Sequence, residues 1–171
     1  MNKNVVLTGM MGVGKSTVGK MLAKKLGYSF VDIDKLIEKK EGCSINLIFK
    51  KKGEDYFRKL ENDISLYELK KNNSVISLGG GAFLNRSIRM ISKKLSVSFW
   101  LDVNIDELIR RLEKTKKRPL LYKKNLSVEV KKIYLERKKT YIKANYRVKC
   151  NFLKLNEIVN TVLQLYAKSG N

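Results

Sequence analysis

The sequence predicts an α/β fold in three layers, with a five-stranded parallel sheet flanked by helices on both faces. Two observations favour this class. Short apolar runs alternate with segments of helical periodicity along most of the 171 residues, and glycine-rich stretches follow two of the apolar runs directly. The length suits one domain and no linker-like segment interrupts the chain, so we expect residues 1–171 to form a single domain.

Each expected element follows from a local pattern. Apolar runs of four or five residues between turn-forming or charged residues predict strands. These are residues 5–8, 30–33, 74–78, 97–101 and, with a weaker pattern, 147–150. Apolar residues three or four positions apart predict helices. These are residues 15–26, 35–40, 46–51, 54–71, 86–94, 105–113, 128–144 and 157–167.

The first glycine-rich stretch, residues 9–16, reads Gly-Met-Met-Gly-Val-Gly-Lys-Ser and has the spacing of a phosphate-binding loop. Glycines permit a tight turn that aims backbone N–H groups at phosphate oxygens, and the following helix adds its positive end. Lys15 can reach the outer phosphates, and the Ser16 hydroxyl can ligate Mg²⁺. The motif therefore predicts a nucleoside triphosphate site. Its expected contacts are Gly12, Val13, Gly14, Lys15, Ser16 and Thr17.

The composition excludes several kinds of chemistry. The chain has no histidine, which rules out imidazole bases, Ser-His-Asp hydrolysis and histidine metal ligands. Cys43 and Cys150 form no paired motif, so we expect neither a zinc site nor a disulfide. No apolar run is long enough to cross a bilayer, and strand-like residues begin at Asn4, so we expect a cytoplasmic protein with no membrane partner.

The net charge of +21 allows two interpretations. A strongly basic protein can bind nucleic acid or another anionic surface. Alternatively, lysine replaces other polar residues on solvated helix faces. The basic runs are spread along the chain with few aromatic residues among them, which favours solvated faces. Part of the positive field can still attract anionic substrates.

Two aspartates, Asp32 and Asp34, end the second predicted strand. Strand alternation would place the two aspartate side chains on one side of the sheet and Ile33 on the other. The aspartates would then lie at the carboxyl edge of the sheet, where ligands bind. One carboxylate could lie near Mg²⁺ while the other accepts a hydroxyl proton; solvated strand-end or helix-capping aspartates are the alternative. In many phosphate-loop proteins an aspartate at the end of the third of these strands holds Mg²⁺ through water. Here that strand has Ser77 followed by glycines, so we assign the metal-binding role to Asp32.

Three consecutive glycines, Gly79, Gly80 and Gly81, follow the third predicted strand. Without side chains they allow a ligand to approach backbone N–H groups closely, although a simple turn has the same composition. Residues 114–125 lack periodicity and contain the only proline, Pro119, which makes them a candidate mobile lid or a plain surface loop.

Three arginines stand out where lysine dominates. Arg58, Arg118 and Arg137 indicate planar, bidentate contact with a carboxylate or phosphate. Glu61 lies one helical turn after Arg58 and can hold its guanidinium.

Together these motifs resemble those of the shikimate kinase family, within the nucleoside-monophosphate-kinase branch of P-loop folds. The resemblance runs from about residue 5 to residue 144, and the order and spacing of its markers are more specific than any one of them. The markers are residues 9–17 with Gly19, Asp32-x-Asp34, Gly42-x-Ser44-Ile45, Gly53-Glu54-x-x-Phe57-Arg58-x-x-Glu61, Gly79-Gly80-Gly81, Arg118-Pro119-Leu120-Leu121 and Arg137-x-x-x-Tyr141.

The resemblance implies a P-loop kinase fold with a lid and ATP-dependent phosphorylation of the 3-hydroxyl of shikimate with Mg²⁺. It implies catalytic roles for Lys15 on the phosphates, Asp34 on the substrate hydroxyls and Arg118 as it closes from the lid. It also implies that Arg111 stacks near adenine, with Arg110 as the competing candidate. The other implied substrate contacts are Arg58, Glu61, Gly79, Gly80, Gly81 and Arg137, with Phe49 and Phe57 lining the pocket.

Two other functions remain open at the level of sequence. The first is another small-molecule P-loop kinase, for gluconate or a nucleotide. The second is a nucleotide-dependent protein that binds nucleic acid through its charge. We favour the shikimate kinase reading, with shikimate as the small-molecule partner, a monomeric enzyme and no nucleic-acid partner.

Overall fold

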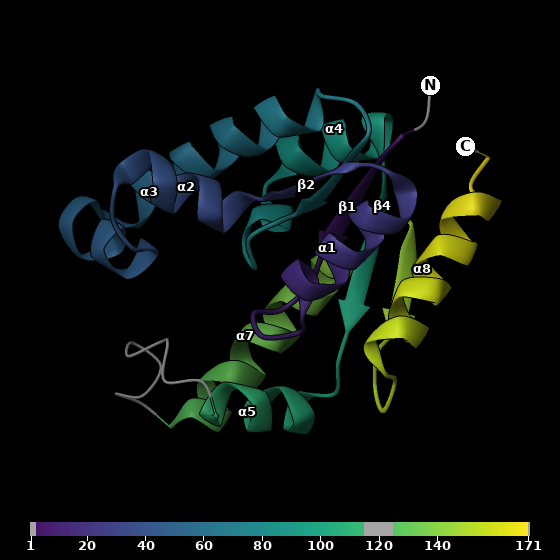
Figure 1. The fold of residues 1–171 in the computed structure, drawn as a ribbon. Coiled ribbons are helices and arrows are strands. Elements are labelled where there is room, and N and C mark those ends of the chain that lie inside the picture. The colour runs from purple at the N-terminus through teal and green to yellow at the C-terminus, as the bar shows by residue number, and fades with distance from the viewer. Residues whose placement is uncertain (1–2, 115–124, 171) are drawn as a thin grey trace.

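The computed structural model describes residues 3–114 and 125–170 and contains the predicted parallel sheet (Figure 1). Its five strands run in the order β2-β3-β1-β4-β5, and every neighbouring pair is parallel. The predicted α/β class is therefore confirmed. Most of the expected lid, including Arg118, lies outside the described residues. The strands are β1 (Asn4–Thr8), β2 (Ser29–Asp32), β3 (Ser74–Ser77), β4 (Ser96–Asp102) and β5 (Tyr146–Lys149).

Helices cover both faces of this sheet. α1 packs on β2 and β3 and against α8, whereas α4 packs on β4 and against α3 (Figure 1). In the described part of the chain, no helix combines the length and apolarity needed to span a membrane. The helices are α1 (Lys15–Leu26), α2 (Ile33–Glu41), α3 (Ile45–Leu69), the short 3₁₀ helix η1 (Ala82–Leu84), α4 (Arg86–Leu95), α5 (Ile105–Glu113), α7 (Leu126–Tyr141) and α8 (Leu155–Lys168).

The central strands form the core. Val5, Val6 and Leu7 of β1 are completely buried, and every residue of β4 is buried. Strands that have helices on both faces are rich in apolar residues, and both of these strands were predicted from their apolar residues. At the two edges of the sheet, β2 and β5 are less buried, and β5 is the strand whose sequence pattern was weaker.

One boundary that differs from the sequence-based prediction changes the setting of a site residue. β2 ends at Asp32, whose side chain caps α2 by accepting a hydrogen bond from the Lys35 backbone N–H at 3.3 Å. Asp34 therefore lies in the first turn of a helix, and the strand-alternation argument for it was wrong. The two helices predicted at 46–51 and 54–71 are present as the two halves of α3, which is interrupted at Gly53, where the backbone is not helical (φ 81°, ψ 173°).

A buried polar network joins α7 to the sheet. The Asp102 carboxylate accepts hydrogen bonds from the Tyr134 hydroxyl at 2.9 Å and from Arg147 Nε and Nη2 at 2.9 and 2.6 Å. Burial, with the hydrogen bond to Asp102, raises the pKa of Tyr134 to about 12, so this hydroxyl stays protonated and donates at neutral pH. The network fixes the helix that carries Arg137.

We expect Tyr134→Phe to lower the free energy of unfolding by about 2 kcal/mol, because it removes a buried hydrogen bond to a charged group. Urea unfolding followed by circular dichroism measures this loss. Tyr67→Phe is the matched control, since Tyr67 is 65% exposed, and it should change stability by less than about 0.5 kcal/mol. Equal losses in the two variants would contradict a stabilising role for the network.

Candidate active site

The loop between β1 and α1 has the geometry of a phosphate cradle. Gly9, Gly12 and Gly14 have φ values of 135°, 79° and 99°, which side-chain-bearing residues rarely adopt. The loop borders a cavity of about 260 Å³, whose wall also includes Asp34 from α2. The lining residues are Met11, Gly12, Gly14, Lys15, Ser16, Thr17, Asp34, Ser77, Leu78 and Gly80. Val13 is buried in the core, so its backbone is the part suited to a ligand.

The ammonium group of Lys15 lies over this loop. Its Nζ donates to the carbonyl oxygens of Gly9 at 2.9 Å and Met10 at 3.0 Å. A phosphate oxygen carries negative charge and a carbonyl oxygen does not, so phosphate attracts the ammonium group more strongly. A bound phosphate could therefore draw Lys15 toward itself.

Ser16 and Asp32 form the oxygen pair that a magnesium ion would need. The Ser16 hydroxyl donates to Asp32 Oδ2 at 2.5 Å, so the first residues of α1 and the end of β2 meet beside the loop. Mg²⁺ in proteins commonly uses one or two such oxygens and completes its shell with phosphate and water. The described residues contain no cluster of three or more acidic or cysteine side chains, and the Ser16–Asp32 pair fits this sparse mode of binding.

The three glycines after β3 each face a different charged side chain. A Cβ atom on Gly79 would lie 2.6 Å from Asp34 Oδ1 and 2.5 Å from Glu61 Oε1. A Cβ on Gly80 would lie 3.2 Å from Arg137 Nη1, and one on Gly81 would lie 2.6 Å from Arg58 Nη1. None of these three glycines has a positive φ, so glycine is required here because a side chain would not fit and not because of the backbone conformation.

Two glutamates hold the guanidinium of Arg58. Its Nη1 donates to Glu61 Oε2 at 2.7 Å, as the spacing predicted, and its Nε donates to Glu54 Oε1 at 3.1 Å. Burial raises the pKa of Glu61, and the positive charge of Arg58 opposes that rise. Sequence reasoning gave Glu54 no role, although its position four residues before Arg58 on one helix was a usable signal.

Phe49 and Phe57 support Arg58 and line neither the cavity at the phosphate loop nor the cavity that Arg58 and Arg137 face. Their ring centroids are 4.7 Å apart, and the Arg58 guanidinium lies 5.1 Å from the Phe57 ring and 6.0 Å from that of Phe49. A guanidinium over an aromatic face is stabilised by the ring quadrupole.

Arg58 and Arg137 face a second cavity of about 390 Å³. The helix that carries Arg137 is tied to the glycine loop by the buried Tyr141, whose hydroxyl donates to the Gly80 carbonyl oxygen. Tyr141 belonged to a sequence marker but had no expected role. The cavity is lined by Glu54, Arg58, Glu61, Gly81, Leu84, Asn85, Ile88, Ile133, Glu136 and Arg137.

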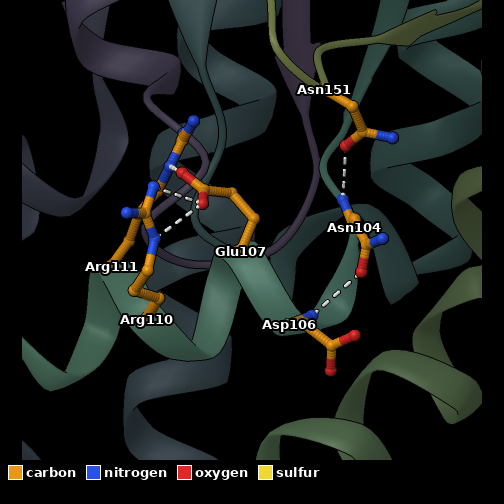
Figure 2. Close-up of polar contacts among 6 residues, drawn as sticks. All are labelled: Asn104, Asp106, Glu107, Arg110, Arg111 and Asn151. Carbon is orange, nitrogen blue, oxygen red and sulfur yellow. Dashed lines mark hydrogen bonds and ion pairs between the residues drawn. The ribbon is translucent and has the colours of Figure 1, made fainter.

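Arg111 lies apart from these groups, on α5, where its Nε donates to Glu107 Oε1 at 2.8 Å (Figure 2). It lines neither cavity. The structure thus brings together Lys15, Ser16 and Asp34 at one cavity, with Asp32 bound to Ser16 beside it. Arg58, Glu61 and Arg137 line the neighbouring cavity, and the glycine loop 79–81 contributes Gly80 to the first and Gly81 to the second.

A family model described as shikimate kinase matches residues 11–167. The chain belongs to the shikimate kinase family. A shikimate kinase of Sulfurihydrogenibium sp. is 44% identical over 94% of this chain and 96% of its own length, and that of Persephonella marina is 43% identical over 94% and 97%. The solved Acinetobacter baumannii shikimate kinase in complex with shikimate superposes with a TM-score of 0.93 at 31% identity, covering 99% of this chain and 96% of its own.

Membership of the shikimate kinase family confirms the predicted activity, which is ATP-dependent phosphorylation of shikimate. A gluconokinase from Sinorhizobium meliloti superposes with a TM-score of 0.60 at 21% identity, covering 97% of this chain and 92% of its own. That similarity reflects the fold alone. The alternative of a gluconate kinase is therefore not favoured.

We expect Gly81→Ala to lower kcat/KM for shikimate by about a hundredfold, because the new methyl group would displace the Arg58 guanidinium. The KM for ATP should change little. Steady-state kinetics of Gly81→Ala should be measured in the wild-type enzyme and in the Arg58→Ala variant. Arg58→Ala has no guanidinium for the added methyl group to displace, so Gly81→Ala should have little further effect there. An equal loss in both backgrounds would show that the methyl group acts elsewhere.

Proposed function

We propose that this shikimate kinase transfers the γ-phosphoryl group of ATP to the 3-hydroxyl of shikimate, with Mg²⁺, at the two adjoining cavities. The observation that carries the proposal is the convergence of one carboxylate, Asp34, and two arginines, Arg58 and Arg137, on consecutive glycines beside the phosphate loop. A carboxylate selects a hydroxyl and a pair of arginines selects an acid, so the pair of cavities suits a hydroxy acid.

The donor half of the site would lie along the phosphate loop. Backbone N–H groups from Gly12 to Thr17 would bind the β- and γ-phosphates, with Lys15 neutralising their charge. Ser16 and Asp32 would hold Mg²⁺, which when bound supplies charge neutralisation on the phosphate oxygens. Arg118 would close over the phosphates from the lid, as the family resemblance implies.

The acceptor half would lie across the glycine loop. Arg58 and Arg137 would bind the shikimate carboxylate, with Glu61 and Glu54 holding Arg58 in place. Asp34 would bind the ring hydroxyls at the cavity that also contains Lys15. Because the two cavities adjoin at Gly79, Gly80 and Gly81, a ring held by its carboxylate in one would present a hydroxyl to the other. We assign the 3-hydroxyl as the phosphorylated group because the resemblance to the shikimate kinase family implies it.

In the reaction, Asp34 orients the hydroxyl and accepts its proton as the oxygen bonds to the γ-phosphorus and the bond to the ADP oxygen breaks. Phosphoryl transfer of this kind is achieved mainly by positioning and charge stabilisation, so a chain without histidine can perform it. Lys15 stabilises charge on the transferred group and the leaving phosphate.

We also propose that the enzyme acts as a cytoplasmic monomer without a nucleic-acid or membrane partner. The distribution of its basic residues along the whole chain, without one dense basic tail, supports this view of the +21 charge.

We expect Asp34→Asn to lower kcat by about 10²–10⁴-fold, because the amide can no longer accept the proton. ADP release coupled to a dehydrogenase, measured with and without shikimate and Mg²⁺, provides the assay. Asp55→Asn is the matched control, since Asp55 is an exposed acid on α3 outside both cavities.

Unchanged turnover in Asp34→Asn would refute the role of Asp34. Absence of shikimate-dependent ADP release by the wild-type enzyme would refute the function itself.

A further inference from the structure

One tyrosine hydroxyl lies where α7, the glycine loop and the phosphate loop meet. The Tyr141 hydroxyl donates to the Gly80 carbonyl oxygen and lies 4.0 Å from Sδ of Met10 in the phosphate loop. Tyr141 is completely buried, and its ring centroid is 5.9 Å from that of Trp100 on β4. A Cβ on Gly9 would in turn lie 3.4 Å from Trp100 Cδ1. Tyr141 therefore belongs to the packed layer beneath both loops.

Gly80 lies between the phosphate loop and an arginine of the acceptor cavity. A Cβ on Gly80 would lie 3.2 Å from Arg137 Nη1 and 3.5 Å from the backbone nitrogen of Met11. Arg137 precedes Tyr141 by four residues on α7, so the two side chains lie on the same face of the helix. The guanidinium and the hydroxyl thus approach the same glycine from one helix.

The Tyr141 hydroxyl is a donor at neutral pH. Burial raises the pKa of Tyr141, and the positive charge of Arg137, with a hydrogen bond between the two side chains, opposes part of this rise. Because the net shift is upward, the hydroxyl stays protonated and can satisfy the Gly80 carbonyl oxygen.

Loss of this hydroxyl would leave the Gly80 carbonyl oxygen directed at a buried apolar ring. An acceptor that loses its partner in such a place costs about 1–3 kcal/mol, so the carbonyl would take another donor. The Arg137 guanidinium lies close enough to Gly80 to become that donor. A guanidinium bound to the glycine loop would be withdrawn from a substrate carboxylate.

We propose that Tyr141 is a positioning residue for the acceptor, whose hydroxyl occupies the Gly80 carbonyl oxygen and thereby leaves the Arg137 guanidinium to bind the substrate carboxylate. The competing acceptor is part of the site itself, and the tyrosine removes it before the substrate arrives. The inference rests on the proposed function, since it concerns how the acid substrate of that reaction is held.

The test compares shikimate with its carboxamide, in which an uncharged amide replaces the carboxylate, as substrates of Tyr141→Phe. This variant loses the hydroxyl and keeps the ring. We expect the KM for shikimate to rise about tenfold, with kcat and the KM for ATP nearly unchanged, because the carboxylate is bound equally in the ground state and the transition state. The KM for the carboxamide should change little, so the ratio of kcat/KM for the two substrates should fall about tenfold. This ratio is measured on one enzyme sample and does not depend on the fraction that is folded.

Two further variants isolate the cause. Tyr166→Phe is the matched control, because Tyr166 is also buried, its hydroxyl donates to the Lys3 backbone carbonyl oxygen, and it lines neither cavity. It should keep the wild-type ratio of kcat/KM. In an Arg137→Ala background, Tyr141→Phe should cause no further fall in the ratio, because no guanidinium remains for the carbonyl to bind.

An unchanged ratio in Tyr141→Phe would overturn the proposal. An equal loss with both substrates would also overturn it, because it would indicate a general distortion of the loops. A fall of the same size in the Arg137→Ala background would show that the hydroxyl acts on another group.

The wild-type measurements separate this inference from the proposed function. Absence of shikimate-dependent ADP release by the wild type would refute the function and the inference with it. A large wild-type ratio that Tyr141→Phe leaves unchanged would refute the role of Tyr141 alone.

Discussion

The absence of side chains at Gly79, Gly80 and Gly81 is the constraint on which the site depends. Two arginines and two carboxylates reach the same short loop, and at each glycine a methyl group would occupy the place of a charged atom or crowd it. Opposite charges at this density would be costly if they were buried without partners. Here Arg58 is paired with Glu61 and Glu54, and the glycines leave room for this cluster beside an anionic substrate.

The position of that loop follows from strand order. β1 and β3 are neighbours in the sheet, and the Leu78 N–H continues the ladder by donating to the Leu7 carbonyl oxygen at 3.0 Å. The phosphate loop and the glycine loop therefore leave the sheet side by side at its carboxyl edge, where α/β proteins bind ligands. α7 completes the arrangement, because Asp102 fixes it to β4 through Tyr134 and Tyr141 binds the glycine loop at Gly80.

Local chemistry explains which features could be predicted from the sequence. Buried strands such as β1 and the spacing of the phosphate loop are encoded within a few residues, as is the Arg58–Glu61 pair within one helical turn. The helical setting of Asp34 was missed because capping by Asp32 ended the strand earlier than its apolar pattern suggested. Contacts between distant segments, such as Tyr134 with Asp102 or Asn104 with Asn151, have no local signal and need the folded chain.

The most direct test of the central claim compares shikimate with its carboxamide, which lacks the negative charge, as substrates of the wild-type enzyme, Arg58→Ala and Arg137→Ala. If both arginines bind the carboxylate beside the glycine loop, the ratio of kcat/KM for the two substrates is large in the wild type and falls toward one in each variant. A ratio that stays at the wild-type value in either variant would contradict the convergence of both arginines on one carboxylate.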